Sequence, residues 1–291
     1  MSGKRIGAEA VEVKGWLRAN KWLLLRRISQ FSILALFLLG PLAGIWIVKG
    51  NLNYSYTLDF LPLTDPYVAL QSAMTGHVPE KLGLIGLAIA LVFYFLVGGR
   101  VYCSWVCPVN LVTDAAGWLR DRMGIKGSVH LSRNTRYWIL GMTLVGSAGT
   151  GVVLWELINP VSMLHRGLIF GLGAAWTVVV AVFFFDLFVM SRGWCGHLCP
   201  VGAFYSLLGR WSPVRVAAPQ RAACNDCMDC FEVCPEPQVI RPALKGEAKG
   251  VGPVILAPNC TNCGRCIDVC SKEVLSFGLR FNNPASSAKV E

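Results

Sequence analysis

Charged residues are scarce in this sequence. Of its 291 residues only 15% are Asp, Glu, Lys or Arg, whereas 54% are hydrophobic and the mean hydropathy is +0.51. Soluble domains have about 25% charged residues, so the composition excludes an ordinary soluble domain and indicates a membrane protein. No P-loop, dinucleotide-binding glycine fingerprint or hydrolase triad stands out either. Nothing therefore points to a nucleotide-dependent or hydrolytic enzyme.

The sequence instead contains long runs of apolar residues. Four of them reach the roughly 17 to 25 residues that cross a hydrocarbon core, namely 28–48, 82–98, 137–157 and 168–190. A buried helix of a soluble protein would explain any one run, but not all four. The first run is too long for a removed signal peptide and lacks a small-residue cleavage site, so we interpret it as an anchor.

The distribution of Lys and Arg predicts the orientation of these runs, because cytoplasmic loops carry an excess of both. Seven precede the first run and six lie within 99–136, whereas 49–81 and the loop around His165 hold two and one. Both termini and the middle loop are therefore expected on the cytoplasmic side of a bacterial inner membrane. This topology and the anionic inner leaflet explain the net charge of +10 without a nucleic-acid partner.

Eight of the twelve cysteines follow the last apolar run, in two copies of the spacing C-x-x-C-x-x-C-x-x-x-C. This spacing is typical of bacterial ferredoxins with two 4Fe–4S clusters, in which the fourth cysteine of each run ligates the other cluster. The predicted ligand sets are Cys224, Cys227, Cys230 and Cys270 for one cluster, and Cys260, Cys263, Cys266 and Cys234 for the other.

Two other uses of these eight cysteines remain open. The reducing cytoplasm disfavours disulfides, and two intact four-cysteine runs disfavour zinc. Pro235 follows the first run but Ser271 follows the second, a small departure from the pattern that removes no ligand. The 25 residues between Cys234 and Cys260 contain Pro, Gly and Lys and are expected to form a surface insertion.

The other four cysteines form a repeated motif. RVYCSWVCPV at 100–109 and RGWCGHLCPV at 192–201 each end an apolar run and precede an amphipathic stretch. Proline suits the first helical turn, so the second cysteine of each motif is expected at a helix N-terminus, where the helix dipole and the arginine of the motif favour the thiolate. Redox chemistry or metal binding suits such cysteines, although cysteines that only pack remain the alternative. The residues concerned are Cys103, Cys107, Cys195 and Cys199.

The repetition suggests a duplicated membrane domain, with the two cysteine pairs facing each other around a further metal centre or cycling through disulfides. We therefore predict an all-α polytopic membrane protein with four transmembrane helices in two parallel two-helix repeats, followed by an α+β two-cluster ferredoxin-like module. The expected domains are a basic cytoplasmic tail (1–27), the membrane domain (28–215) and the cytoplasmic ferredoxin-like domain (216–291).

These motifs, with KWLLLRRISQF, GPLAGIWIVKGN, PLTDPYVALQS and WELINP around them, resemble the NapH family of ferredoxin-type membrane proteins over nearly the whole chain. The resemblance implies a subunit of a quinol dehydrogenase, an electron-transfer oxidoreductase that serves a periplasmic nitrate reductase. It implies menaquinol or ubiquinol as substrate and a NapG-type periplasmic ferredoxin subunit as partner, often with a tetrahaem cytochrome further along. The eight ferredoxin cysteines carry over as cluster ligands, whereas the role of the four C-x-x-x-C-P cysteines stays unsettled.

No motif identifies the quinol site. A quinol needs an apolar slot and polar groups that take its protons, and ionisable residues at the edges of membrane spans are costly enough to indicate function. The residues that meet this description on the predicted periplasmic face are, in order of preference, Glu156 and His165 with Arg166, then Asp65 and His77. Asp186, inside the fourth run, is explained as well by pairing with an arginine.

Electrons bound for the periplasm have no evident reason to visit cytoplasmic clusters, and two other functions therefore stay open. A copper-reducing assembly factor for an oxidase would use the cysteine pairs to reduce or pass metal. A scaffold subunit would bind the periplasmic partner without turning over. The lack of a long N-terminal flavin-binding domain disfavours the larger nitrous-oxide-related relatives.

Overall fold

The structure, a computed structural model, describes residues 6–125, 127, 129, 131–171, 173 and 175–281. They form two compact units. The cysteine-rich unit comprises the described parts of 1–29, 94–105 and 206–291, and the helical unit comprises those of 30–93 and 106–205. Residues 1–5 of the predicted tail and 282–291 of the predicted ferredoxin-like domain lie outside the described residues.

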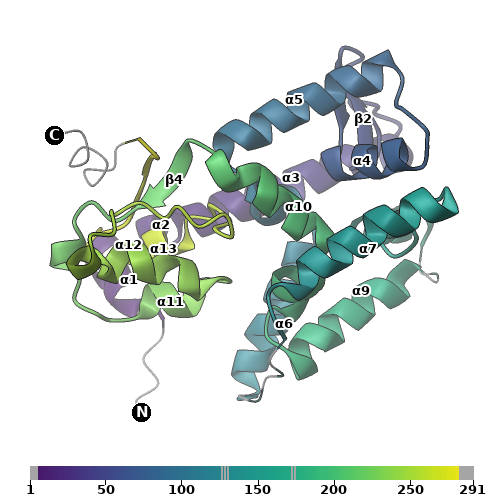
Figure 1. Cartoon of the computed structure of the whole chain (residues 1–291). Coiled ribbons are helices and arrows are strands. Elements are labelled where there is room, and N and C mark those ends of the chain that lie inside the picture. The colour runs from purple at the N-terminus through teal and green to yellow at the C-terminus, as the bar shows by residue number, and fades with distance from the viewer. Residues whose placement is uncertain are drawn as a thin grey trace, which may run out of the picture. The chain divides into compact units, whose positions relative to one another are not determined.

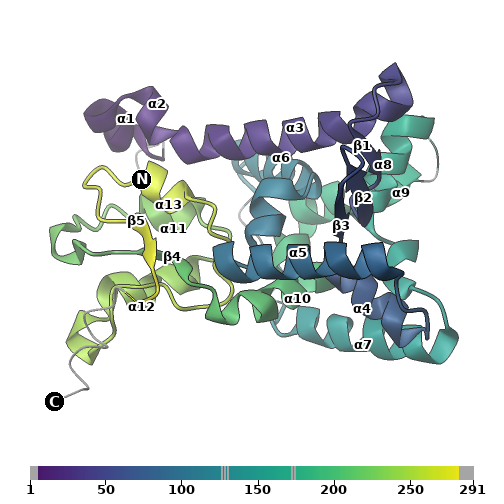
Figure 2. The same cartoon turned by 90° about the horizontal axis from the view of Figure 1, so that it is seen from above.

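Helices make up most of the helical unit, and three of them, α3, α5 and α10, have one end in the cysteine-rich unit. Within the helical unit α6 packs against α9 and α4 packs against α7 (Figure 1). Helix α8 also packs against α9 (Figure 2). The helices are α3 (Lys21–Ala43), α4 (Pro66–Met74), α5 (Lys81–Val97), α6 (Val109–Arg122), α7 (Thr135–Thr150), α8 (Pro160–Phe170), α9 (Ala175–Phe184) and α10 (Pro200–Leu208).

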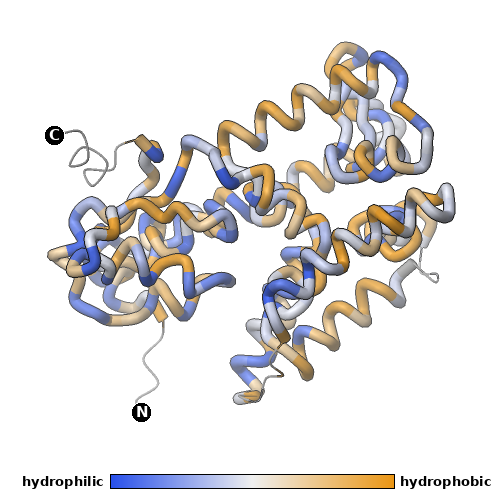
Figure 3. The backbone as a smooth tube through the Cα atoms, in the orientation of Figure 1, coloured by the Kyte–Doolittle hydropathy of each residue, from blue (hydrophilic) through white to orange (hydrophobic). Residues whose placement is uncertain are grey.

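One helix of the described chain, α3, is long and apolar enough to cross a membrane. Two shorter apolar helices are α5 and the segment Trp176–Val189, which contains most of α9 and the π-helical turn after it. Four transmembrane helices therefore stay a prediction. The exposed surfaces are nevertheless strongly apolar. On α7, Trp138, Met142 and Val145 share one face at helical spacing and are 76%, 65% and 71% exposed. Figure 3 shows apolar residues along much of α5 and α9 as well.

Three of the predicted runs differ from the helices in their bounds, and in each of them a glycine at positive φ accounts for the place where a helix stops. Helix α3 ends at Ala43, short of residue 48, because Gly44 has a φ of 74°. Helix α7 ends at Thr150, short of residue 157, because Gly151 has a φ of 68°. The run 168–190 is divided between α8 and α9, because Gly171 between them has a φ of 88°. The run 82–98 matches α5 to within one residue.

A small antiparallel sheet follows α3, where the sequence predicts only a loop. Its strands are β1 (Val48–Gly50), β2 (Tyr54–Thr57) and β3 (Leu61–Thr64), in the order β1-β2-β3 (Figure 2). Across the register Ser55 faces Gly50 on one side and Leu63 on the other. The prediction of an all-α membrane domain omits this sheet, because strands of three or four residues are too short to show an alternating pattern.

The cysteine-rich unit combines a two-stranded antiparallel sheet with short helices, in agreement with the predicted α+β module. The strands are β4 (Val214–Ala217) and β5 (Ser276–Leu279), and between them along the chain lie α11 (Asp229–Val233), α12 (Ile240–Lys245) and α13 (Arg265–Asp268). Apolar residues of all these segments form one core with Cys230 and Cys266. Two of the cysteines thus belong to the folded interior.

The segment between Cys234 and Cys260 corrects one expectation. It is not only a surface insertion, because Ile240, Ala243 and Leu244 of α12 are 1%, 1% and 5% exposed and belong to the core. Their i, i+3, i+4 spacing is that of a helix with one buried face. Without this helix the small module would have too little apolar surface to bury.

The N-terminal segment belongs to the cysteine-rich unit as well. It forms α1 (Ala8–Lys14) and α2 (Trp16–Ala19), and Ala10 is fully buried. The Asp268 carboxylate accepts hydrogen bonds of 3.0 Å from the backbone N–H groups of both Trp22 and Leu23, in the first turn of α3. A carboxylate there satisfies free N–H groups and complements the helix dipole.

Candidate functional site

The cysteines of the first run lie on a tightly wound loop. Asp226 and Met228 take left-handed φ angles of 56° and 66°, so the chain turns back on itself between successive cysteines. A pocket opens inside this loop, and four cysteines contribute to its lining: Cys224, Cys227, Cys230 and Cys270. The structure therefore brings together the four residues of the first predicted ligand set, including the one from the second run.

The second run repeats this backbone. Asn262 and Gly264 occupy the equivalent places and have φ angles of 47° and 74°. Cys263 and Cys266 are each 8% exposed. The thiols that act on the pKa of Cys266 include those of Cys263, Cys260 and Cys234, so the second predicted set also lies together.

Burial and mutual proximity make these thiols hard to ionise. Burial is the main cause that raises the pKa of Cys230 to about 12 and that of Cys260 to about 11, and it raises the pKa of Cys266 well above its usual range. Neighbouring thiols add to each of these shifts. Thiolates are stable in such a place only beside compensating cationic charge, which bound metal supplies.

The chemistry of the two donor sets fits an iron–sulfur cluster. A 4Fe–4S cluster takes four cysteine thiolates, each bound to a different iron. Each predicted set offers four thiols, and those of the first set line one pocket. Among the described residues no group of three His, Cys, Asp or Glu side chains forms a site for a single ion.

Both C-x-x-x-C-P motifs adopt a π-helical turn, which sequence spacing did not reveal. The turns are η1 (Tyr102–Val106), which holds Cys103, and η4 (Trp194–Leu198), which holds Cys195. In η4 the Cys199 N–H donates to the Trp194 carbonyl, five residues back, at 2.9 Å. Cys199 then directly precedes Pro200, the first residue of α10. Single π-helical turns are frequent at functional sites.

The four motif cysteines are divided between the two units. Cys103 lies in the cysteine-rich unit, and the other three lie in the helical unit. There Cys107 borders a small core around Val161, and Cys199 borders another around Trp155; Trp194 packs against both cores. The thiol of Cys195 is 3.9 Å from the Thr113 hydroxyl.

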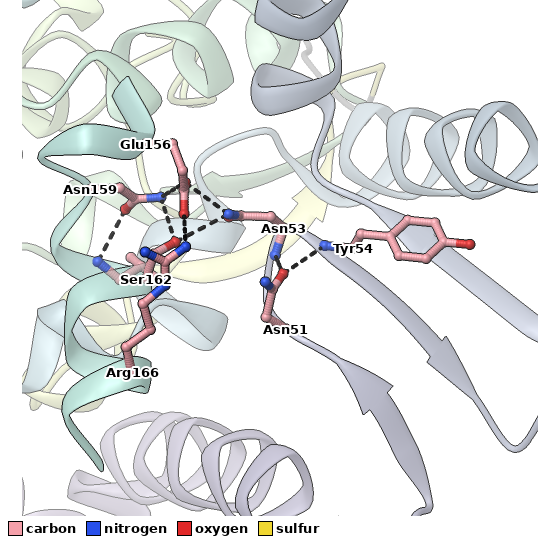
Figure 4. Close-up of polar contacts among 8 residues, drawn as sticks. Asn51, Asn53, Tyr54, Glu156, Asn159, Ser162 and Arg166 are labelled. Atoms are coloured by element: carbon pink, nitrogen blue, oxygen red, sulfur yellow. Dashed lines mark hydrogen bonds and ion pairs between the residues drawn. The ribbon is translucent and has the colours of Figure 1, made fainter. Parts of the chain in front are cut away.

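Glu156 stands at the centre of a polar cluster in the helical unit (Figure 4). Its carboxylate accepts hydrogen bonds from the side-chain amides of Asn53, at 2.8 Å, and Asn159, at 3.1 Å. Arg166 lies 3.7 Å from the other carboxylate oxygen, and the Glu156 side chain is 22% exposed. The cluster therefore holds an oriented, accessible carboxylate.

Two turns that do not figure among the predicted site residues build this cluster. Asn51 accepts hydrogen bonds from the backbone N–H groups of Asn53 and Tyr54, at 2.9 and 3.0 Å, and so holds Asn53 toward Glu156. Asn159 caps α8 by accepting from the Val161 N–H at 3.1 Å. The signals were present: an Asn-x-Asn turn after β1 and Asn-Pro at a helix start.

His165 is separate from the Glu156 hydrogen bonds. Its side chain is buried beside Phe37, with ring centroids 5.9 Å apart, and its Nε2 has no hydrogen-bond partner in the described part of the chain. Burial lowers its pKa, with the nearby Arg166 charge acting in the same direction, so the ring is neutral at pH 7.

The three weaker candidates for the quinol site are Asp65, His77 and Asp186, and their surroundings differ. Asp65 caps α4, and its carboxylate also accepts from the Tyr205 hydroxyl at 3.1 Å. His77 is exposed after α4. The Asp186 carboxylate accepts from the Trp194 N–H at 2.9 Å and so holds the start of η4, whereas Arg120 donates to the Leu187 carbonyl at 2.6 Å.

Comparison with known families agrees with the two kinds of cysteine motif. The family described as "4Fe-4S binding domain" matches residues 81–126 and again 170–219, and "4Fe-4S dicluster domain" matches 223–274. The first two matches contain the two C-x-x-x-C-P motifs, so the duplication extends over a helix, the motif and the helix after it. These features define an iron–sulfur protein of electron transfer.

Whole-chain relatives place the protein more narrowly. The chain is 54% identical to the methylamine utilization ferredoxin-type protein MauN of Methylorubrum extorquens, over 94% of both chains. It is 48% identical to the ferredoxin-type protein NapH of Escherichia coli over 97% of both chains, and 48% identical to NapH of Haemophilus influenzae over 96% and 97%. The chain belongs to this family of ferredoxin-type proteins. No solved structure matches it.

Proposed function

We propose that this protein is a membrane electron-transfer subunit that carries electrons from quinol toward a periplasmic reductase, and that it binds two 4Fe–4S clusters. One observation carries the proposal: eight cysteines lie in two backbone loops of the same conformation, with four of them around one pocket. When bound, the clusters supply one-electron transfer.

The proposed ligand sets are those of the sequence analysis. Cys224, Cys227 and Cys230 hold one cluster with Cys270, and Cys260, Cys263 and Cys266 hold the other with Cys234. Backbone turns, and not side-chain flexibility, place the thiols, since Asp226, Met228, Asn262 and Gly264 all have positive φ.

A multi-pass arrangement in the bacterial inner membrane accounts for the apolar surface. Besides the α7 face, Leu84 and Phe93 of α5 and Phe188 beyond α9 are 43%, 50% and 55% exposed. Water would disfavour so much contiguous apolar surface, whereas lipid would not. We propose four membrane crossings with both termini in the cytoplasm.

Glu156 is the proposed proton acceptor for menaquinol or ubiquinol. Oxidation of a quinol releases two electrons and two protons, and an accessible carboxylate held by two amides can accept a proton without moving. His165, neutral and buried beside Phe37, is the second proposed residue of the site. The Arg166 guanidinium lies 3.7 Å from the carboxylate and borders the same site.

The proposed route beyond this chain is that of the NapH relatives: a NapG-type periplasmic ferredoxin subunit, a tetrahaem cytochrome and then nitrate reductase. Identity of 48% to two NapH proteins supports it. The test is EPR of anaerobically purified protein together with quinol-to-nitrate electron flow in membranes. We expect about eight irons per chain and two interacting 4Fe–4S signals, and quinol should reduce at least one. Purified protein that is folded but colourless and EPR-silent contradicts the proposal.

Methylamine oxidation is a second candidate setting, because the chain is 54% identical to a MauN protein. A deletion strain distinguishes the two. Loss of growth on methylamine with unchanged nitrate reduction favours the MauN setting, and the reverse favours the NapH setting. The ligand sets and the quinol site are the same in both.

The C-x-x-x-C-P cysteines are proposed as a redox or metal-binding group of the membrane domain. The family description "4Fe-4S binding domain" over both motifs supports this. Iron in clear excess of about eight per chain, and its loss in Cys103→Ser or Cys195→Ser, is the expected sign of a further centre. Iron that stays at that level in both variants leaves a dithiol role.

A further inference from the structure

Arg100, which opens the first C-x-x-x-C-P motif, is buried in an ion pair within the cysteine-rich unit. Its Nη1 donates to Glu236 at 2.7 Å, and the two side chains are 2% and 1% exposed. The same nitrogen donates to the backbone carbonyl of Asn259 at 2.8 Å. Glu236 lies two residues after Cys234, and Asn259 directly precedes Cys260. One guanidinium therefore joins the two separate segments that supply the second ligand set.

The rest of the motif turn contacts the same ligand loop. The Ser104 hydroxyl donates to the Thr261 carbonyl at 2.8 Å, and the Trp105 indole N–H donates to the Asn262 carbonyl at 3.2 Å. In return the Asn262 amide donates to the Val97 carbonyl at 3.1 Å, at the end of α5. These contacts lie between Cys260 and Cys263.

The turn that seats Arg100 also places Cys103, whose N–H donates to the Arg100 carbonyl at 3.1 Å. An aromatic group continues from this turn: the Trp22 ring lies 6.2 Å from Trp105 and 4.7 Å from Phe277, centroid to centroid. Trp22 in turn covers Gly264, between Cys263 and Cys266. The first motif and Trp22 thus both contact the loop of the second ligand set.

The electrostatic surroundings of the two ligand sets differ. Arg100 and the buried Arg215 both act on the Cys260 thiolate. Near Cys224 the Lys245 ammonium lies 3.9 Å from the sulfur, and its side chain is 39% exposed, where water screens the charge. A fixed, desolvated charge changes the energy of adding an electron far more than a screened one.

We propose that Arg100 is a positioning residue for the cluster of Cys234, Cys260, Cys263 and Cys266: its buried pair with Glu236 fastens the first C-x-x-x-C-P turn to this cluster and sets its reduction potential. The inference rests on the ligand sets proposed above. In this proposal the first C-x-x-x-C-P motif contacts the cluster of Cys234, Cys260, Cys263 and Cys266. The other cluster, whose ligand Cys227 is exposed, is then the one that faces a further partner.

The test is a potentiometric EPR titration of the full-length, detergent-purified protein with dithionite and mediators. Reduction adds negative charge, so Arg100→Gln lowers the midpoint potential of one cluster and Glu236→Gln raises it. Arg100→Lys keeps the charge and restores the wild-type value. Lys49→Gln, which removes the cation of an exposed ion pair (2.6 Å to Asp59) in the helical unit, shifts neither cluster.

Cys263→Ser and Cys227→Ser identify the signals, because each removes a ligand of one cluster only. The inference is overturned if both clusters shift alike, if the shifted signal is the one lost in Cys227→Ser, or if Arg100→Gln and Glu236→Gln shift it in the same direction. If Arg100→Gln loses its iron, the midpoint potentials of Glu236→Gln and Arg100→Lys test the inference in its place. Quinol takes no part in the titration, so a protein that binds clusters but does not oxidise quinol fails the proposed function and not this inference.

Discussion

Single residues in left-handed conformations shape both ligand loops, and the two loops solve the same problem differently. Met228 and Gly264 are equivalent, at φ 66° and 74°. Met228 is 50% exposed, so its side chain has room despite the strained backbone, at a cost of roughly 1–2 kcal/mol. A Cβ at Gly264 would lie only 2.5 Å from the Trp22 ring. Glycine is required there by packing as much as by φ.

Gly264→Ala therefore destabilises the cysteine-rich unit by more than backbone strain alone. We expect about 1–3 kcal/mol from the clash in addition to about 1 kcal/mol from the left-handed φ. Gly250→Ala is the matched control, since its φ is 68° and nothing lies within 4 Å of the added Cβ. The measurement is the rate of cluster bleaching on heating, followed by visible absorbance. Equal rates in the two variants contradict the packing argument, and Trp22→Ala should partly rescue Gly264→Ala.

Glu156→Gln keeps the hydrogen-bonding shape of the carboxylate but removes its ability to accept a proton. We expect the rate of quinol oxidation to fall about 10²-fold or more, because general bases contribute about 10²–10⁴-fold, with a smaller change in KM. Glu80→Gln, which changes an exposed carboxylate of the first predicted outer loop, should leave the rate unchanged. The assay is quinol-dependent reduction of the clusters by stopped flow. An unaltered rate in Glu156→Gln would remove this residue from the site.

At the scale of elements, the cysteine spacing and the prolines were informative because they act locally. The motif C-x-x-C-x-x-C predicts a ligand loop from bonds within a dozen residues, and Pro108 and Pro200 mark the starts of α6 and α10. The small sheet and the π-helical turns escaped prediction. Strands of three or four residues carry no period, and an α-helical and a π-helical turn share the same apolar residues.

Long-range contacts were the other part that the sequence did not reveal. The sequence predicts that Arg100 favours a thiolate of its own motif, whereas its buried partner in the fold is Glu236, 136 positions away. Likewise Asn53 and Glu156 are 103 positions apart. Pairing at such separation depends on the tertiary fold, and no local pattern encodes it. The candidate residue Glu156 was identified from its chemistry, but the amides that orient it were not.

At the scale of the whole molecule, the membrane topology determines the compartment of the eight ferredoxin cysteines and therefore the cofactor that they can hold. If α3 alone crossed the membrane, with the basic N-terminal segment inside, every later segment would face the periplasm. The eight ferredoxin cysteines would then lie in an oxidising compartment, where disulfides form. Four crossings instead return them to the cytoplasm, where thiols stay reduced and available to iron. The number of crossings therefore decides between the two uses of these cysteines.

Reporter fusions to the full-length gene separate these arrangements. With four crossings, alkaline phosphatase should be active after Gly76 and Gly171 and inactive after Gly124, and a fluorescent protein should mature after Gly124 and at the C-terminus. With one crossing, phosphatase would be active at all three glycines, because each follows α3 and none would return to the cytoplasm. The fusion after Gly124 is decisive. It follows Arg120 and Arg122 at the end of α6, and those two cations hold this loop inside only if α5 has crossed back.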